Sequence, residues 1–215
     1  MDKNTNQTVK PEVILGVSDY TLDNFVAQGM SKITRLGIEP LAGEFPDADG
    51  WLVEFVMLRM FDIRLPTDKA ALTFAILRRA HGALQEWELA ATASLEDMRS
   101  IGAYFRVLRH VENCISATWQ ALEFARRATE INLFTKDDGT VYQRLNSVYN
   151  VSRHFNPEAL PEGDLHRTWL SDEAIHTREH AVKFAELRET VSSLARMSEK
   201  LVKKRAPYRD AAERD

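Results

Sequence analysis

The chain has 215 residues, of which 28 are basic and 32 acidic, so its formal net charge is −4, and 44% of its residues are hydrophobic. This composition is typical of a globular protein with one core, and it excludes a mainly disordered chain. The negative balance also excludes a general attraction to nucleic acid or anionic membranes. No stretch approaches the roughly 20 apolar residues of a membrane-spanning helix, and Met1–Lys10 lacks the apolar core of a signal peptide. We therefore expect a cytoplasmic protein.

The hydrophobic pattern predicts an all-α fold. Apolar residues recur at intervals of three and four along most of the chain, and no run of β-branched residues alternates with period two. We expect residues 1–18 to form a flexible leader, residues 19–205 a single helical-bundle domain, and residues 206–215 a frayed tail. The bundle is predicted to be antiparallel, with five to six helices. The helices are expected at about 21–36, 51–63, 67–91, 94–129, 140–155 and 171–201.

Capping residues predict where several of these helices begin. Thr67 follows Pro66 and is expected to cap the third helix, and Ser94 with Asp97 three residues later is a capping signature for the longest. Ser171 is expected to cap the last helix, whose first turn then contains two acidic residues that suit the helix dipole.

Cys114 is the single cysteine. It excludes an intramolecular disulfide and every zinc site that needs paired thiolates. No activating partner is adjacent in sequence, so we expect a buried structural thiol, because free cysteines are among the most buried residues. The sequence predicts no cofactor.

Two groups of polar residues could lie between helices. Glu173, His176 and His180 have the spacing i, i+3, i+7, which would place them on one face of the expected last helix, where they could hold a metal with a ligand from another helix. The alternative is that Glu173 only serves the helix dipole. His81 and Glu88 are likewise seven apart.

If His81 and Glu88 faced Glu112 of the long helix, burial would perturb their pKa values. We favour the simpler interpretation, in which these residues are polar interruptions that set the register of the helices.

Local positive charge offers a further candidate site. Arg106, Arg109 and His110 cluster within about one turn, and a second basic group follows Lys200. Such groups can contact phosphates, with binding that weakens as salt rises, or can simply solvate a helix surface.

The segment from Tyr149 to His154 carries a family resemblance. Asn150 and His154 are four residues apart, with Arg153 beside them. The segment resembles the signature of the HEPN superfamily, helical bundles named from higher-eukaryote and prokaryote nucleotide-binding proteins. That signature is an Arg, four to six residues and a His, commonly with a polar residue after the Arg. Here Tyr149 stands at the position of the Arg.

The resemblance covers about residues 67–203. Many members are ribonucleases of toxin–antitoxin, CRISPR and abortive-infection systems, and they dimerise so that two motifs face each other. Because the family's Arg acts on the scissile phosphate, its absence implies a non-catalytic homodimer that binds RNA or a protein partner, within a bacterial defence or toxin–antitoxin type of system. The implied RNA or partner cleft comprises Tyr149, Asn150, Arg153 and His154, with Arg106 and Arg109 as phosphate contacts.

Two alternatives remain open. One is a metal-binding helical-bundle enzyme that uses Glu173, His176 and His180. The other is a protein–protein adaptor that docks through residues 51–63, whose side chains are apolar nearly all round the helix. For that segment we expect burial within the bundle.

Overall fold

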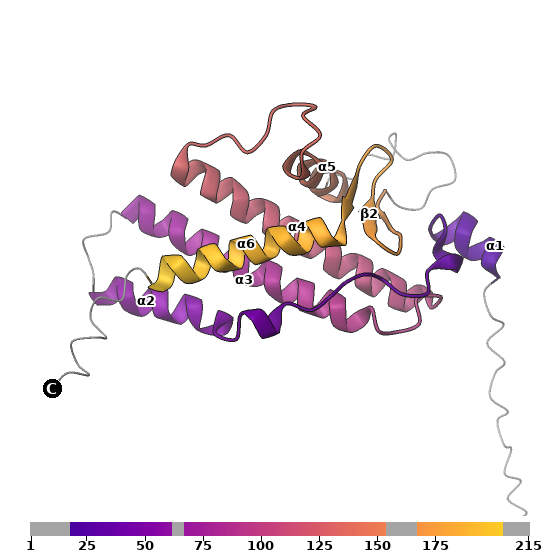
Figure 1. The fold of residues 1–215 in the computed structure, drawn as a ribbon, viewed down its shortest axis with the longest axis horizontal. Coiled ribbons are helices and arrows are strands. Elements are labelled where there is room, and N and C mark those ends of the chain that lie inside the picture. Colours follow the sequence, from indigo (N-terminus) through magenta and orange to yellow (C-terminus); the bar gives the residue numbers. More distant parts are fainter. Residues whose placement is uncertain (1–17, 62–66, 154–166, 204–215) are drawn as a thin grey trace, which may run out of the picture.

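The computed structural model describes residues 18–61, 67–153 and 167–203. They form six α-helices and one small antiparallel sheet (Figure 1), which confirms the predicted mostly helical fold and adds strands to it. No helix of these three ranges is both long enough and apolar enough to cross a membrane. Except for Ser18, the predicted leader lies outside the described residues, as does the predicted tail. The helices are α1 (Asp19–Thr21), α2 (Trp51–Phe61), α3 (Thr67–Ala93), α4 (Ile101–Thr129), α5 (Val141–Arg153) and α6 (Phe184–Lys203).

The centre of the bundle is the pair of long helices α3 and α4, with α6 lying along them (Figure 1). Their inward faces repeat every three or four residues, and these side chains are almost completely excluded from water. Phe105 has the spacing of the apolar residues of α4 but lies on the outer side and is 36% exposed. The main buried side chains of the pair are Leu77, Leu84, Trp87, Tyr104, Val107, Val111, Ile115 and Trp119.

The predicted N-terminal helix at 21–36 is wrong. Only α1 and a five-residue π-helix, Leu22–Val26, are helical before the chain becomes irregular. Gly29 adopts a left-handed conformation with φ 76°, which breaks the helix, and a short 3-10 turn follows. Met30 and Ile33 are nevertheless buried. The spacing of apolar residues therefore predicted the burial of this segment correctly, but it did not predict the conformation of its backbone.

The predicted start of the longest helix is also wrong. Ser94 lies just beyond the end of α3, where its hydroxyl donates to the carbonyl oxygen of Ala91 at 2.7 Å. Helix α4 begins at Ile101, and its N-cap is Ser100, whose side chain accepts from the amide of Ala103. Both serines can cap a helix through the hydroxyl group, and although only Ser94 has an acid three residues later, the structure uses Ser100.

The first part of the predicted last helix is a β-hairpin. The sheet consists of β1 (Trp169–Leu170), β2 (Ala174–His176) and β3 (Ala181–Lys183), in the order β1-β2-β3. Ile175 pairs with Val182, and both are fully buried. β-branched residues at facing positions favour a sheet. Ser171 therefore does not cap α6, and the segment expected to begin the last helix forms the hairpin instead.

The loop between the 3-10 turn at Met30–Lys32 and α2 runs along the bundle (Figure 1) and is fastened to α3. The indole N–H of Trp87 donates to the carbonyl oxygen of Glu39 at 2.7 Å. The Glu88 carboxylate accepts from the backbone amides of Leu41 and, at 2.8 Å, of Ala42. These bonds satisfy loop groups that no regular structure pairs, so they fix the loop beside α3.

Cys114 is fully buried in α4, as predicted. Burial raises the pKa of its thiol to about 12, so almost no thiolate exists at neutral pH. We expect the native protein to react with a thiol reagent at least about 100-fold more slowly than the protein unfolded in guanidinium, because only the thiolate reacts. Ellman's reagent measures both rates. Rapid, stoichiometric modification of the native protein would contradict the buried placement.

Candidate functional site

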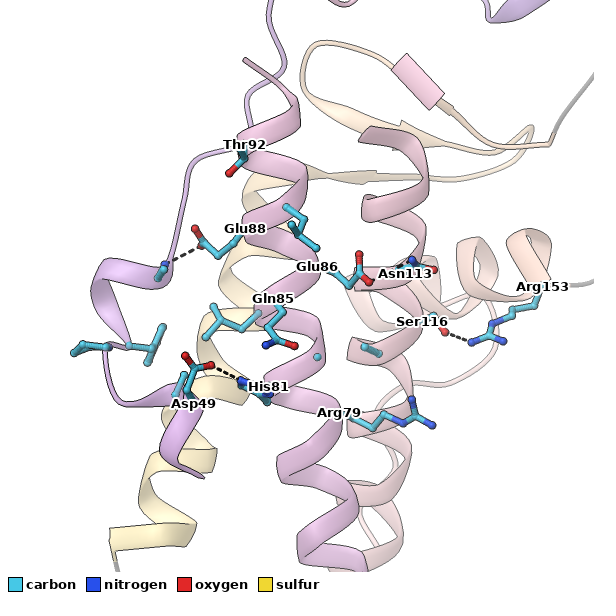
Figure 2. A pocket seen from close by; sticks show the side chains of 18 residues that line it. Asp49, Arg79, His81, Gln85, Glu86, Glu88, Thr92, Asn113, Ser116 and Arg153 are labelled. Atoms are coloured by element: carbon cyan, nitrogen blue, oxygen red, sulfur yellow. Dashed lines mark hydrogen bonds and ion pairs between the residues drawn. The ribbon is translucent and has the colours of Figure 1, made fainter. Parts of the chain in front are cut away.

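A cleft of about 860 Å³ crosses the outer surface of α3 (Figure 2). One wall is the loop at 42–49, and the other is α4 with the end of α5. Its size is within the range of small-molecule sites, and its lining is a mixture of charged, polar and apolar side chains. Gly82 of α3 lies in its floor, and a Cβ there would meet nothing within 4 Å, so the centre of the cleft is open.

On the loop side, the His81 side chain is largely buried beside Trp51 and points toward Asp49 (Figure 2). The His81 Nε2 and the Asp49 Oδ1 are 2.9 Å apart, although the Asp49 side chain is 92% exposed. Glu88 is engaged by the loop amides, and Glu112 accepts a hydrogen bond from the Thr168 hydroxyl. His81, Glu88 and Glu112 therefore do not meet, and each has its own structural partner.

On the α4 side, Glu86 is the central carboxylate. Its Oε2 lies 2.7 Å from the Nδ1 of His110, and the Asn113 amide donates to its Oε1 at 3.4 Å. Arg109 is exposed, and its guanidinium lies 3.5 Å from the His110 Nε2. Arg106 forms an ion pair with Glu96. Neither of these predicted phosphate contacts lines the cleft.

At the end of α5, only one of the residues predicted for an RNA or partner cleft lines the pocket. The Arg153 guanidinium donates to the Ser116 hydroxyl and lies 5.6 Å from the ring centroid of Tyr149. Tyr149 packs on Trp119 of α4, with 6.4 Å between ring centroids, instead of facing the cleft. Asn150 is exposed, and its amide donates to Asn146. His154 lies outside the described residues.

Sequence analysis missed Arg79, which lines the same cleft from α3 (Figure 2). Its Nε is closed off from solvent without a hydrogen-bond acceptor. Within the described ranges, neither Arg79 nor Arg153 forms an ion pair, whereas Arg126, Arg144 and Arg188 do. The available signal was the spacing i, i+3, i+7 of Arg79, Gly82 and Glu86, which only the neighbouring helix makes meaningful.

The face predicted for a metal site does not exist, because its residues belong to the hairpin and not to a helix. His176 is in β2, where its Nε2 is 2.8 Å from the Ser171 hydroxyl oxygen and its ring stacks on Trp169. Burial lowers the pKa of His176 and favours the neutral ring. His180 is in the turn that follows. Among the residues that the structure describes, no three His, Cys, Asp or Glu side chains are grouped to hold a metal ion.

The second feature on the surface is the outer face of α2. Trp51 and Phe55 are buried against the bundle, so the expected burial of this segment holds for one face. The opposite face carries four exposed apolar side chains at the spacing i, i+3, i+4, i+7. Their exposed fractions are 64% for Val53, 46% for Val56, 48% for Met57 and 68% for Met60. We call these four residues the α2 stripe.

Comparison of the chain with protein-family models gave no match, and comparisons with curated proteins and with solved structures gave none. The resemblance to the HEPN superfamily therefore rests on the residues quoted above.

Proposed function

We propose that this chain is a non-catalytic helical protein that acts by binding, and that it docks on a protein partner through the α2 stripe. The supporting observation is the four exposed apolar side chains on one helix face. Exposing a contiguous apolar face of this kind to water is unfavourable. Burying it against a partner lowers the free energy. Single exposed leucines, such as Leu95, need no such explanation.

The partner that the stripe fits first is a second copy of this chain. Two copies of α2 related by a two-fold axis between positions 56 and 57 would run antiparallel. Val56 would then face Met57 of the other helix, and Val53 would face Met60 of the other helix, so the stripe is complementary to itself. Isologous dimers are the commonest assemblies, and methionines adapt their shape to such an interface.

The measurement that tests this proposal is the molar mass in solution, by light scattering after size exclusion. We expect a dimer for the unmodified chain and a monomer for Met57→Glu, with a dissociation constant raised at least about 100-fold, because each copy would bury a charge. Met57 is exposed within one chain, so the substitution leaves the fold intact. The matched control is Leu95→Glu, which adds the same charge away from α2 and should remain dimeric. A monomeric unmodified chain at high concentration would count against self-association.

The HEPN-like interpretation adds RNA as a partner and bacterial defence as a setting. Its support is the spacing of Asn150 and His154, together with the position of Arg153 at the cleft. Tyr149 in the position of the family's Arg supports binding without cleavage. Retention of RNA that falls as salt rises, and that His154→Ala reduces, is the expected result. If the amount of retained RNA changed neither with salt concentration nor in His154→Ala, this part of the proposal would be wrong.

A further inference from the structure

We infer that the cleft over α3 binds a phosphate group between Arg79 and Arg153, with Ser116 and Asn113 as additional hydrogen-bonding groups. All four side chains line one cleft, and in Figure 2 they lie on the α4 side of α3. They come from three helices, so tertiary packing brings them together. The inference is independent of docking through α2, and it shares only Arg153 with the RNA proposal.

Exposed arginines such as Arg78 and Arg127 form no ion pair within the described ranges, and the two arginines that line the cleft form none either. Six described arginines have a carboxylate partner, whereas Arg79 and Arg153 have none within the described ranges. Arg79 also keeps its Nε out of water without an acceptor, which is costly for a polar group. An anion in the cleft that accepts from the terminal nitrogens of both guanidinium groups would give each arginine a charged partner. Arginine forks match phosphate oxygens better than lysines do.

The neutral groups of the site suit the same ligand. Ser116 already accepts from Arg153, so its hydroxyl hydrogen can point to a ligand oxygen. Asn113 is exposed, and its weak 3.4 Å contact with Glu86 is easily exchanged for a ligand. These groups, unlike carboxylates, accommodate an anion without repulsion.

Glu86 limits how much negative charge the cleft accepts. Its carboxylate lies in the same lining and is held by His110 at 2.7 Å. Asp49 and Glu88 line the cleft as well, but on the loop side, where His81 and the loop amides hold them. The α4 side alone therefore sets two arginines against one carboxylate, and this side suits a single phosphate group. The cleft of about 860 Å³ is far larger than a phosphate ion, so the group belongs to a larger molecule. A mononucleotide and an RNA strand are two sources of this chemistry.

Isothermal titration at low salt tests the site, with two probes applied separately: adenosine monophosphate and a single-stranded RNA of about 12 nucleotides. We expect Arg79→Ala and Arg153→Ala each to weaken binding about tenfold, as the loss of a charged hydrogen bond does. Glu86→Gln should strengthen it. The matched control is Arg78→Ala, which removes an exposed arginine next to Arg79 that does not line the cleft. Thermal unfolding of each variant confirms that it is folded.

The outcomes separate the inference from the RNA proposal. If the mononucleotide binds and both arginine variants lose it, the phosphate site is supported and a free nucleotide is its source. If only RNA binds, with the same losses, the site is supported as an RNA contact. If His154→Ala weakened RNA binding and Arg79→Ala did not, RNA would remain the partner but the phosphate site would be overturned. Binding of neither probe, or equal losses in Arg78→Ala, would also overturn it.

Discussion

Replacing Trp87 with alanine is expected to lower the free energy of unfolding by about 3–5 kcal/mol, the largest effect of any single substitution that we propose. Trp87 belongs to α3, and its indole is fully buried. Its removal leaves a cavity, and the carbonyl oxygen of Glu39 loses its donor. Because that bond fastens the loop beside α3, the loop wall of the cleft should also loosen. Urea unfolding followed by circular dichroism measures the loss.

A graded control separates packing from hydrogen bonding at this position. Trp87→Phe keeps most of the apolar volume and loses the donor, so we expect a loss of about 1–2 kcal/mol. Val53→Ala, at an exposed position of α2, should change the stability of the monomer by less than about 0.5 kcal/mol. If Trp87→Ala cost no more than Val53→Ala, the indole would not be the central packing element that the structure shows.

Replacing Arg144 with alanine is expected to cost about 2 kcal/mol. Its guanidinium forms a two-pronged ion pair with Glu186 of α6, at 2.7 and 2.9 Å, and donates to the carbonyl oxygen of Ala181 at 2.9 Å. One side chain thus joins α5, the hairpin and α6. Both partners are less than one third exposed, so water screens the pair only in part.

The same pair predicts a pH dependence. The hydrogen bond from Arg144 holds the pKa of the Glu186 carboxyl below its usual value. The stabilisation is therefore complete above the unfolded-state pKa of about 4.3, and it is lost as pH falls through the lower folded-state pKa. The stability difference between the unmodified chain and Arg144→Ala should be full at neutral pH and shrink in acid. Glu186→Gln should remove most of this dependence, and a difference that persists unchanged at the lowest pH would contradict it.

The helices that the sequence predicts best are those whose own pattern is strong. Trp87 lies on a long stripe of period three to four and Cys114 is of a residue type that is usually buried, and α3 and α4 bury both side chains. A stripe of this length has one stable arrangement, a helix that packs along its whole length against another. Met30 has helical spacing within the expected helix at 21–36 and is buried, but it lies in a 3-10 turn.

The hairpin shows where local pattern is ambiguous. Between Ser171 and Phe184 the sequence offers a good helix cap and acidic residues for a first turn, and it also offers Ile175 and Val182 at facing positions of a hairpin. The segment forms the hairpin, which buries both side chains completely, and β2 also pairs with β1. Burial against the rest of the domain outweighs a helical preference of a few tenths of a kcal/mol per residue.

By itself, the sequence determined the mostly helical class of this protein, many of the positions that face its core and its negative net charge, because these follow from periodicity and composition. Only the tertiary structure decided that Arg79 and Arg153 share a cleft, that Arg106 is paired elsewhere, and that the α2 stripe faces outward. The physical reason is that a helix pattern states which residues share a face, while the direction of that face depends on the packing of helices distant in sequence.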